Sequence, residues 1–263
     1  MKTIRILGKH LLAVLAIMLV AYTGSGCDAK NTELRVFAAA SLQNALLELN
    51  ELYMQKNTHI RIVSNFAGSG ALQQGIENSP GSCDVFVSAA AAQMDNLQDK
   101  GLLLDDTRKN ILNNKVVLIV PINSTLNITS FDDLAKASVR TIAIGNPASV
   151  PAGAYAQEIL KLLGIFGNIS AEFNYGSSAT QVLQWVESGN ADAGIVFSTD
   201  ALSSAKVKIV AEAPYEINAK VVYPVAIIKE CKNVAAAQEY IEFLFSNEAK
   251  AIFEKYGFAV VAK

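Results

Sequence analysis

Four short segments could hold a ligand through backbone amides, because each reads as the end of a strand followed by the start of a helix. None carries a charged side chain; they are A-A-S-L at Ala39–Leu42, F-A-G-S-G at Phe66–Gly70, V-P-A-G at Val150–Gly153 and G-S-S-A-T at Gly176–Thr180. A helix start presents unpaired N–H groups and the positive end of the peptide dipoles. Four such starts directed at one point would form a neutral cage, which predicts a site for a small oxyanion.

The first two segments each supply a serine. We expect Ser41 and Ser69 to be the N-caps of the first two helices, where a hydroxyl and the neighbouring N–H groups could donate to an anion. Gly68 and Gly70 would allow close backbone approach. The structural alternative is that each serine satisfies only its own helix, which is the usual work of a capping residue.

The other two segments offer backbone donors. Pro151 suits the first position of a helix, where its missing N–H would be unpaired in any case, so the free donors begin at Ala152. Ser177, Ser178 and Ala179 open the fourth helix in the same way.

Short apolar runs that alternate with segments of helical period must position these starts. Alternation of this kind predicts crossover units, parallel sheets and an α/β fold. We expect two doubly wound, three-layer lobes joined by two crossing strands, with lobe one at 34–114 plus 224–263 and lobe two at 115–223. A single long sheet is the alternative, and either topology places ligands at the carboxyl ends of the strands.

The expected elements follow from the apolar pattern. Strands are expected at L-R-V-F-A, I-R-I-V-S, D-V-F-V-S-A, K-V-V-L-I-V, T-I-A-I-G, E-F-N-Y, A-G-I-V-F, V-K-I-V and V-V-Y-P-V-A-I-I. Helices are expected at 41–55, 69–78, 90–100, 234–245 and 247–256, and from near Phe131, Ala152, Ser178 and Thr199.

The first 26 residues read as a leader rather than as part of the fold. A basic start precedes an apolar run of 12 residues, Leu11–Tyr22, which is shorter than the ~20 residues that span a membrane. The run ends in T-G-S-G-C, which resembles the lipobox of bacterial lipoproteins and implies lipidation of Cys27, with residues 27–33 as a tether. Ordinary cleavage near Gly26, which would release a soluble protein, is the alternative.

The remaining cysteines, Cys83 and Cys231, lie at the start and the end of two apolar strands. If these strands are antiparallel neighbours, a disulfide can form; two separate thiols are the alternative. Neither cysteine has a histidine near it in the sequence, as a zinc site would need. The net charge of −2, with no basic face, argues against a nucleic-acid partner.

The four segments also lack the groups that other functions need. They contain no acid, base and nucleophile set, which argues against an extracytoplasmic enzyme, and no arginine and carboxylate pair for an amino acid. A cage of donors alone suits a fully deprotonated dianion, whereas phosphate near pH 7 carries a proton that needs an acceptor. We therefore expect phosphate to be rejected.

A family resemblance rests on longer stretches in the same order along 36–258. The chain resembles the molybdate-binding proteins of bacterial ABC importers in V-F-A-A-A-S-L, D-V-F-V-S-A, G-N-P-A-S-V-P-A-G-A-Y-A, A-G-I-V-F-S-T-D-A, Y-P-V-A and F-E-K-Y-G-F. The resemblance implies a type 2 periplasmic-binding-protein fold whose lobes close on molybdate or tungstate, with sulfate as the alternative oxyanion. The metal would enter as the oxyanion itself, with no cofactor.

The resemblance also implies residue roles. The anion would be held by the hydroxyls and N–H groups of Ser41 and Ser69 and by the N–H groups of Ala152 and Ala179. Relatives often have a tyrosine ligand where this chain has Phe197, so Ser198, water or another donor would have to replace that hydroxyl. The expected partners are an ABC permease and, through the lipid, the membrane; we expect an extracytoplasmic monomer.

Overall fold

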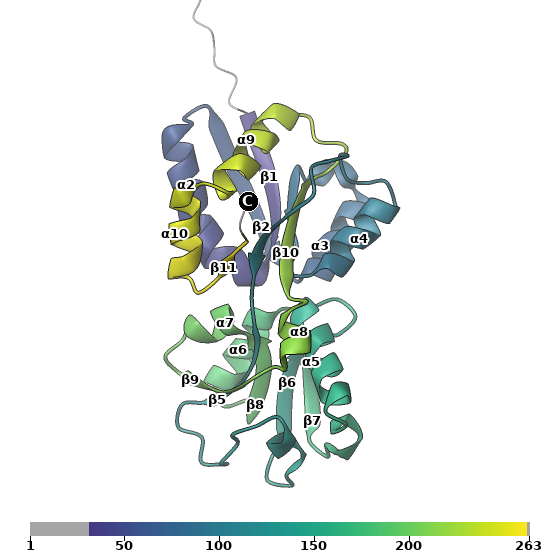
Figure 1. Ribbon diagram of the computed structural model, residues 1–263, viewed down its shortest axis with the longest axis vertical. Coiled ribbons are helices and arrows are strands. Elements are labelled where there is room, and N and C mark those ends of the chain that lie inside the picture. Colours follow the sequence, from purple (N-terminus) through teal and green to yellow (C-terminus); the bar gives the residue numbers. More distant parts are fainter. Residues whose placement is uncertain (1–31, 262–263) are drawn as a thin grey trace, which may run out of the picture. The chain divides into compact units, whose positions relative to one another are not determined.

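The computed structural model describes residues 32–261, which form two α/β lobes, each built on its own sheet (Figure 1). The sheet of lobe one has the strand order β11-β4-β10-β3-β1-β2, and the sheet of lobe two has the order β7-β6-β8-β5-β9. The two-lobe α/β fold expected from the sequence is therefore confirmed, and the single long sheet is excluded.

Lobe one takes its elements from both ends of the described chain. Its strands are β1 (Thr32–Ala39), β2 (Ile60–Ala67), β3 (Val85–Val87), β4 (Lys109–Asn113), β10 (Val222–Ile227) and β11 (Ala259–Val260). Its helices are α2 (Gln43–Lys56), α3 (Ser69–Asn78), α4 (Ala91–Asp99), α9 (Val234–Leu244) and α10 (Asn247–Lys255), with 3-10 turns at Ala40–Leu42 and Pro80–Ser82.

Lobe two is a continuous stretch of chain. Its strands are β5 (Val116–Pro121), β6 (Thr141–Gly145), β7 (Glu172–Gly176), β8 (Ala193–Phe197) and β9 (Val207–Glu212). Its helices are α5 (Pro151–Leu162), α6 (Ala179–Glu187), α7 (Ser198–Leu202) and α8 (Tyr215–Asn218), with 3-10 turns at Asp132–Ala135 and Phe166–Asn168.

Each sheet has parallel strands at the site and antiparallel strands at the crossings. β1 runs parallel to β2 and β3, and β6 runs parallel to β7 and β8. β10 is antiparallel to β3 and β4, and β5 is antiparallel to β8 and β9. The parallel pairing expected from the alternating pattern is thus found where helices connect the strands, and the strands next to the crossings pair antiparallel.

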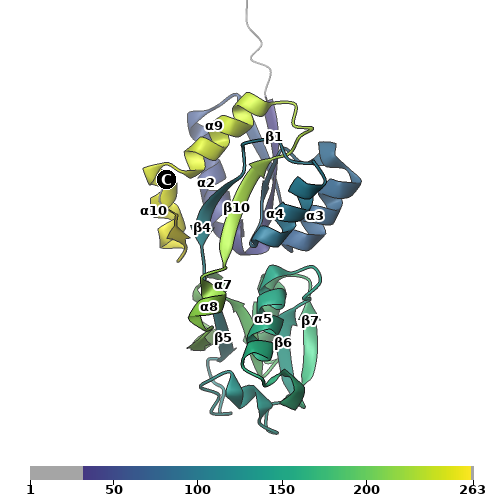
Figure 2. The ribbon, with the colours of Figure 1, turned by 45° about the vertical axis from the view of Figure 1, so that its right-hand side comes forward.

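Two connections join the lobes (Figure 2). The first runs from β4 to β5 through Asn114 and Lys115, and the second returns from α8 to β10 through 219–221. These crossings bring residues that are far apart in sequence to the junction between the lobes.

Burial explains why the elements form where they do. β3, β5 up to Val120 and β8 are buried along their length, as expected for strands covered by helices on both faces. α2 buries Ala45, Leu46, Leu49 and Tyr53 at helical spacing and leaves Leu52 half-buried, as expected for a helix with one face on the core.

Some local predictions were wrong. The α-helix expected near Phe131 is a 3-10 turn at Asp132–Ala135. β4, β11 and α8 were missed, since they are short and, in the case of β4, polar. β1 begins at Thr32, inside the expected tether, because Thr32 and Glu33 already pair with Ile60 and Arg61.

The leader at 1–26, Cys27 and the tether up to residue 31 lie outside the described residues. No helix within residues 32–261 combines the length and hydropathy that crossing a bilayer requires.

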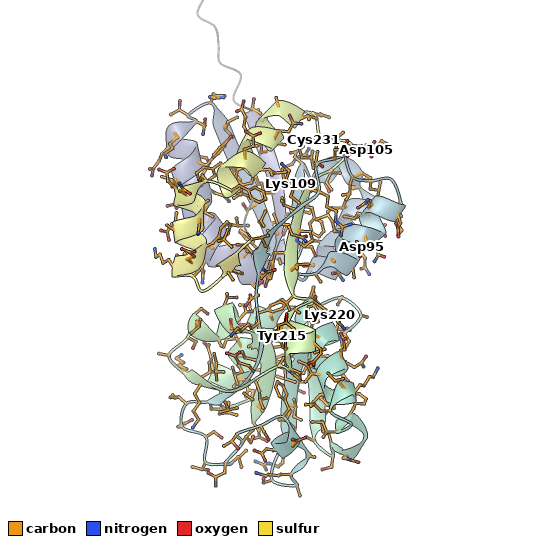
Figure 3. All side chains as sticks on the ribbon, viewed as in Figure 1. Asp95, Asp105, Lys109, Tyr215, Lys220 and Cys231 are labelled. Carbon is orange, nitrogen blue, oxygen red and sulfur yellow. The ribbon has the colours of Figure 1, made fainter. Side chains whose placement is uncertain are left out.

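Cys83 and Cys231 are both buried free thiols, which is the second of the two alternatives. β3 and β10 are antiparallel neighbours, which was the condition for a disulfide, but the Cys83 thiol instead donates to the Val85 carbonyl oxygen at 3.2 Å. Burial raises the pKa of Cys231 to about 11 and raises the pKa of Cys83 as well. Cys231 lies at the end of lobe one that is remote from lobe two (Figure 3).

Candidate functional site

The four predicted segments meet at one small cavity of about 10 Å³ between the lobes. No lining side chain is charged; the lining consists of Ala39, Ala40, Ser41, Ala67, Gly68, Ser69, Ala89, Val150, Pro151, Ser178, Ala179 and Phe197. An apolar and hydroxyl-bearing wall of this kind offers an anion dipoles and donors without a competing negative charge.

Strand register places the lobe-one part of the lining. Ala39 at the end of β1 pairs with Ala67 at the end of β2, and Ala89 follows β3 in the same sheet. The carboxyl ends of parallel strands meet at one sheet edge, which is where open α/β sheets bind ligands. The small side chains at these strand ends leave space for the cavity.

The lobe-two part of the lining is built in the same way. Gly145 and Gly176 pair at the ends of β6 and β7, and α5 and α6 begin shortly after them. Pro151 stands at the start of α5 as predicted. Ala152 follows it, is fully buried and does not line the cavity. Its amide lies in the first turn of α5, where no intrahelical acceptor exists.

Ser41 does not cap a helix, which corrects the sequence prediction. It lies within the 3-10 turn Ala40–Leu42, and α2 begins only at Gln43 with Leu42 as its N-cap. The side chain of Ser41 instead makes a hydrogen bond of 3.0 Å with the hydroxyl of Tyr223. This serine is therefore held by the crossing strand β10, 182 residues away in sequence.

Ser69 is likewise not an N-cap. Gly68 holds that position, and Ser69 is the fully buried first residue of α3. The Ser69 hydroxyl oxygen accepts a hydrogen bond from the backbone N–H of Ala89 at 3.0 Å. Since this partner can only donate, the hydroxyl proton of Ser69 remains available to a ligand.

Gly68 and Gly70 lie close to the backbone of the opposite lobe, and Gly68 also lines the cavity. The Gly70 N–H donates to the Ser149 carbonyl oxygen at 2.9 Å, across the junction. A Cβ on Gly70 would lie 2.6 Å from that oxygen, and one on Gly68 would lie 2.7 Å from the Ser177 carbonyl oxygen. These glycines let the lobes touch beside the cavity, so the structure has the lobes closed at this point.

Ser178 and Ser198 use their hydroxyls elsewhere. The Ser178 oxygen accepts from the Gln181 N–H at 3.1 Å and caps α6, as the structural alternative anticipated. Ser198 donates its hydroxyl proton to the Asn114 side-chain oxygen at 3.1 Å and does not line the cavity.

Phe197 forms part of the cavity wall and is almost completely buried. Its ring packs against Tyr223, with ring centroids 5.7 Å apart, and against Tyr155 at 6.4 Å. An apolar ring therefore stands at the position where the family resemblance implies a tyrosine hydroxyl.

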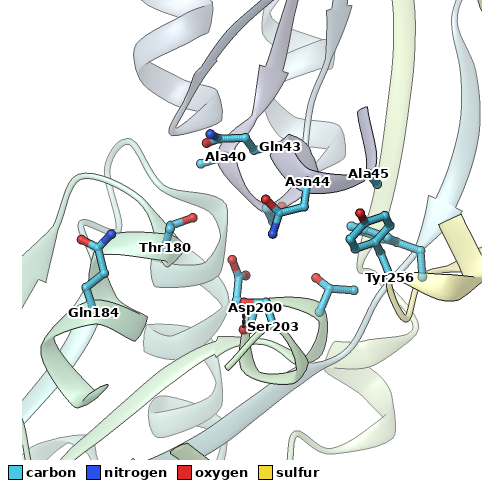
Figure 4. A pocket seen from close by; sticks show the side chains of 12 residues that line it. Ala40, Gln43, Asn44, Ala45, Thr180, Gln184, Asp200, Ser203 and Tyr256 are labelled. Atoms are coloured by element: carbon cyan, nitrogen blue, oxygen red, sulfur yellow. Dashed lines mark hydrogen bonds between the residues drawn. The ribbon is translucent and has the colours of Figure 1, made fainter. Parts of the chain in front are cut away.

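Sequence reasoning missed a second, larger pocket between the lobes, about 230 Å³, which shares Ala40 and Ser41 with the cavity. Asp200 of α7 lines it, and Asn44 of α2 points toward Asp200 from the other lobe (Figure 4). The Asp200 Oδ2 atom is buried without a hydrogen-bond partner among residues 32–261. Burial raises the pKa of Asp200 to about 7, against smaller lowering effects of the Phe197 backbone and the Thr180 hydroxyl.

Comparison with known proteins agrees with this geometry. The model of a family described as bacterial extracellular solute-binding protein matches residues 34–259. The putative ABC transporter substrate-binding lipoprotein YvgL of Bacillus subtilis is 42% identical over 250 residues, 94% of this chain and 95% of the relative. The molybdate-binding protein ModA of Haemophilus influenzae is 35% identical over 257 residues, 95% of this chain and 99% of the relative.

The fold of this chain is also similar to that of a solved substrate-binding domain. The substrate-binding domain of a putative molybdenum ABC transporter from Clostridium difficile matches with a TM-score of 0.68 and 37% identity, covering 88% of this chain and 100% of that one. The resemblance noted from the sequence motifs is thus confirmed, and the matching family consists of solute-binding proteins rather than enzymes. The chain belongs to the bacterial extracellular solute-binding protein family.

Proposed function

We propose that this protein captures molybdate between its two lobes and delivers it to the permease of an ABC importer. The observation that carries the proposal is the meeting of four uncharged strand-to-helix turns, two from each lobe, at one cavity. The molybdate-binding and molybdenum-transporter relatives, at 35% and 37% identity, support this ligand.

In this proposal the protein replaces the water around a doubly negative ion with its own donors. Ser41 and Ser69 donate hydroxyl and backbone N–H groups from lobe one, and Ala152 and Ala179 donate backbone N–H groups from lobe two. Helix N-termini add the positive ends of their dipoles. Ion binding to both lobes at once favours the closed arrangement over the open one.

The same donors select the ligand by its protonation state. No lining residue of the cavity carries a carboxylate that could accept the proton of hydrogen phosphate. Tungstate and sulfate share the full deprotonation of molybdate, so we expect tungstate to bind as well and sulfate to be the main competitor.

We further propose that Cys27 is lipidated and anchors the protein outside the cytoplasm as a monomer. We keep the lobe boundary at 114/115 and move the second one from 223/224 to 221/222, because β10 begins at Val222 in the sheet of lobe one. YvgL, named as a lipoprotein, supports the anchor. Incorporation of a labelled fatty acid into the wild type, and its loss in Cys27→Ser, tests it. Retention of label in the variant would contradict lipidation at this residue.

Titration calorimetry tests the ligand. Wild type should bind molybdate and tungstate more tightly than sulfate and should not bind phosphate. Ser41→Ala should weaken molybdate binding about 10- to 150-fold, because a hydrogen bond to a charged group contributes about 1.5–3 kcal/mol. If sulfate binds more tightly than molybdate, sulfate is the ligand in place of molybdate. If phosphate binds tightly, the site does not select ligands by their protonation state.

A further inference from the structure

We propose that Tyr223 is a positioning residue that directs the hydroxyl proton of Ser41 toward the bound oxyanion. This inference rests on the proposed function. It concerns a residue that does not line the cavity and that lies on the crossing strand β10. The argument follows the direction of each hydrogen bond from Asn114 through Tyr223 to Ser41.

The orientation of the Asn114 side chain is fixed by its neighbours. Its oxygen lies 2.8 Å from the backbone nitrogen of Lys115, which can only donate, and also accepts from Ser198. The Asn114 nitrogen therefore supplies both of its protons on the other side, to Thr199 Oγ1 at 2.9 Å and to the Tyr223 hydroxyl oxygen at 3.0 Å. All four hydrogen-bonding positions of this amide are occupied.

The direction of the next hydrogen bond follows. Tyr223 accepts from Asn114, and its own single proton needs an acceptor because the side chain is fully buried. Within residues 32–261, the Ser41 hydroxyl oxygen at 3.0 Å is the acceptor in reach. Tyr223 therefore donates to Ser41, and the proton of Ser41 is free to be donated to a ligand.

Ser69 provides independent support, because its hydroxyl also accepts a hydrogen bond from the protein, in this case from a group that can only donate. Its hydroxyl oxygen accepts from the Ala89 backbone N–H, which has no alternative direction. Both cavity-lining serines of lobe one, Ser41 and Ser69, thus accept one hydrogen bond from the protein and can donate their proton into the cavity. Chains of hydrogen bonds that run in one direction also polarise each other and strengthen the last donor.

Packing holds the Tyr223 hydroxyl in place. Its ring packs against Phe197, at a centroid distance of 5.7 Å, and against Phe258, at 5.5 Å. The pairing register of β10 with β4 shifts between Tyr223 and Pro224, where proline cannot donate to a ladder. Burial raises the pKa of Tyr223, so the phenol keeps its proton over the whole physiological range.

The experiment compares Tyr223→Phe with Tyr240→Phe by titration calorimetry with molybdate. Tyr240 is a matched control, since it is also fully buried and donates to a buried asparagine, Asn50, at 2.6 Å, within lobe one. Tyr223→Phe should weaken molybdate binding about 5- to 20-fold, while Tyr240→Phe should stay within about twofold of wild type. An unchanged affinity in Tyr223→Phe would overturn the inference.

The same substitution in the Ser41→Ala background separates a positioning role from general destabilisation. There Tyr223→Phe should change the affinity less than twofold, because the hydroxyl that it positions is absent. An equal loss in both backgrounds would show that Tyr223 does not act through Ser41. Wild-type protein that fails to bind molybdate would instead overturn the proposed function.

If Tyr223→Phe does not fold, Asn114→Asp gives the second test. A carboxylate can only accept, so Tyr223 would donate to it and draw the proton of Ser41 away from the anion. The electrostatic cost of the new charge is the same with and without the Ser41 hydroxyl. A larger loss in the wild-type background than in Ser41→Ala supports the inference, and equal losses overturn it.

Discussion

The two halves of the cavity differ in how they offer their donors. Lobe one presents two side-chain hydroxyls, those of Ser41 and Ser69, each held by a hydrogen bond from elsewhere in the protein. Lobe two presents the starts of α5 and α6, and the hydroxyl of Ser178 is committed to its own helix. A side-chain hydroxyl can be removed by one substitution, whereas the backbone amides at a helix start remain in most variants. Substitutions in lobe one should therefore weaken molybdate binding more than those in lobe two, although both halves contact the ion in our proposal.

The largest effect is expected from blocking the contact between the halves. Gly70→Ala would place a Cβ 2.6 Å from the Ser149 carbonyl oxygen and disturb the Gly70–Ser149 hydrogen bond. Overpacking costs about 1–3 kcal/mol and the hydrogen bond about 1 kcal/mol, so molybdate affinity should fall about 30- to 1000-fold. Calorimetry on the purified variant measures this.

Gly75→Ala is the matched control for that variant. Gly75 lies in the same helix, α3, and a Cβ there would meet nothing within 4 Å. It should bind molybdate as wild type does and be more stable by about 0.5–1 kcal/mol, since alanine is the better helix former. Equal affinities for the Gly70 and Gly75 variants would mean that the lobe contact does not govern binding.

Removing a lobe-one hydroxyl should have the next largest effect. Ser69→Ala should weaken molybdate binding about 10- to 150-fold, from the loss of a hydrogen bond worth about 1.5–3 kcal/mol to the ion. It should also lower the free energy of unfolding without ligand, because the Ala89 N–H loses its acceptor. A loss of stability with unchanged affinity would make Ser69 a purely structural residue.

A smaller effect, on stability rather than binding, is expected at the pocket beside the cavity. Because burial raises the pKa of Asp200 from 3.8 to about 7, the folded state binds its proton more tightly than the unfolded state does. Its contribution to stability is greatest below pH 4 and is lost as the pH rises toward 7. Urea unfolding of ligand-free Asp200→Asn between pH 4 and 8 should lack this decline.

The control for that profile is Asp105→Asn, which removes an exposed carboxyl of lobe one. It should follow the wild-type dependence on pH. If Asp200→Asn also follows the wild type, the buried carboxyl does not titrate in this range.

The smallest effect on binding is expected at the serine of lobe two. Ser178→Ala should lower the free energy of unfolding by about 1 kcal/mol, because α6 loses its N-cap, and should change molybdate affinity less than twofold. Thermal unfolding and calorimetry on one sample measure both quantities. A loss of affinity as large as that of Ser69→Ala would erase the difference between the lobes.

The parts of the site that depend on neighbouring residues in the sequence were predictable. Pro151 at a helix start, the small residues after β1 and β2, and the helix 69–78 all follow from patterns within a few residues. The partner of Ser41 does not, because Tyr223 lies 182 residues away and only the second crossing brings it back. Nothing in F-A-G-S-G indicates that Gly70 faces Ser149 of the other lobe, and Asp200 resembles any acidic residue in a first helical turn. Long-range pairing, rather than propensity, decides these contacts.

The central claim is that donors from both lobes surround one oxyanion. A crystal structure of the protein grown with molybdate, with the metal located by its anomalous scattering, tests this most directly. We predict a single ion in the cavity, within hydrogen-bonding distance of the Ser41 and Ser69 hydroxyls and of the Ala152 and Ala179 amides. An ion bound elsewhere, or held by residues of one lobe only, would contradict the account.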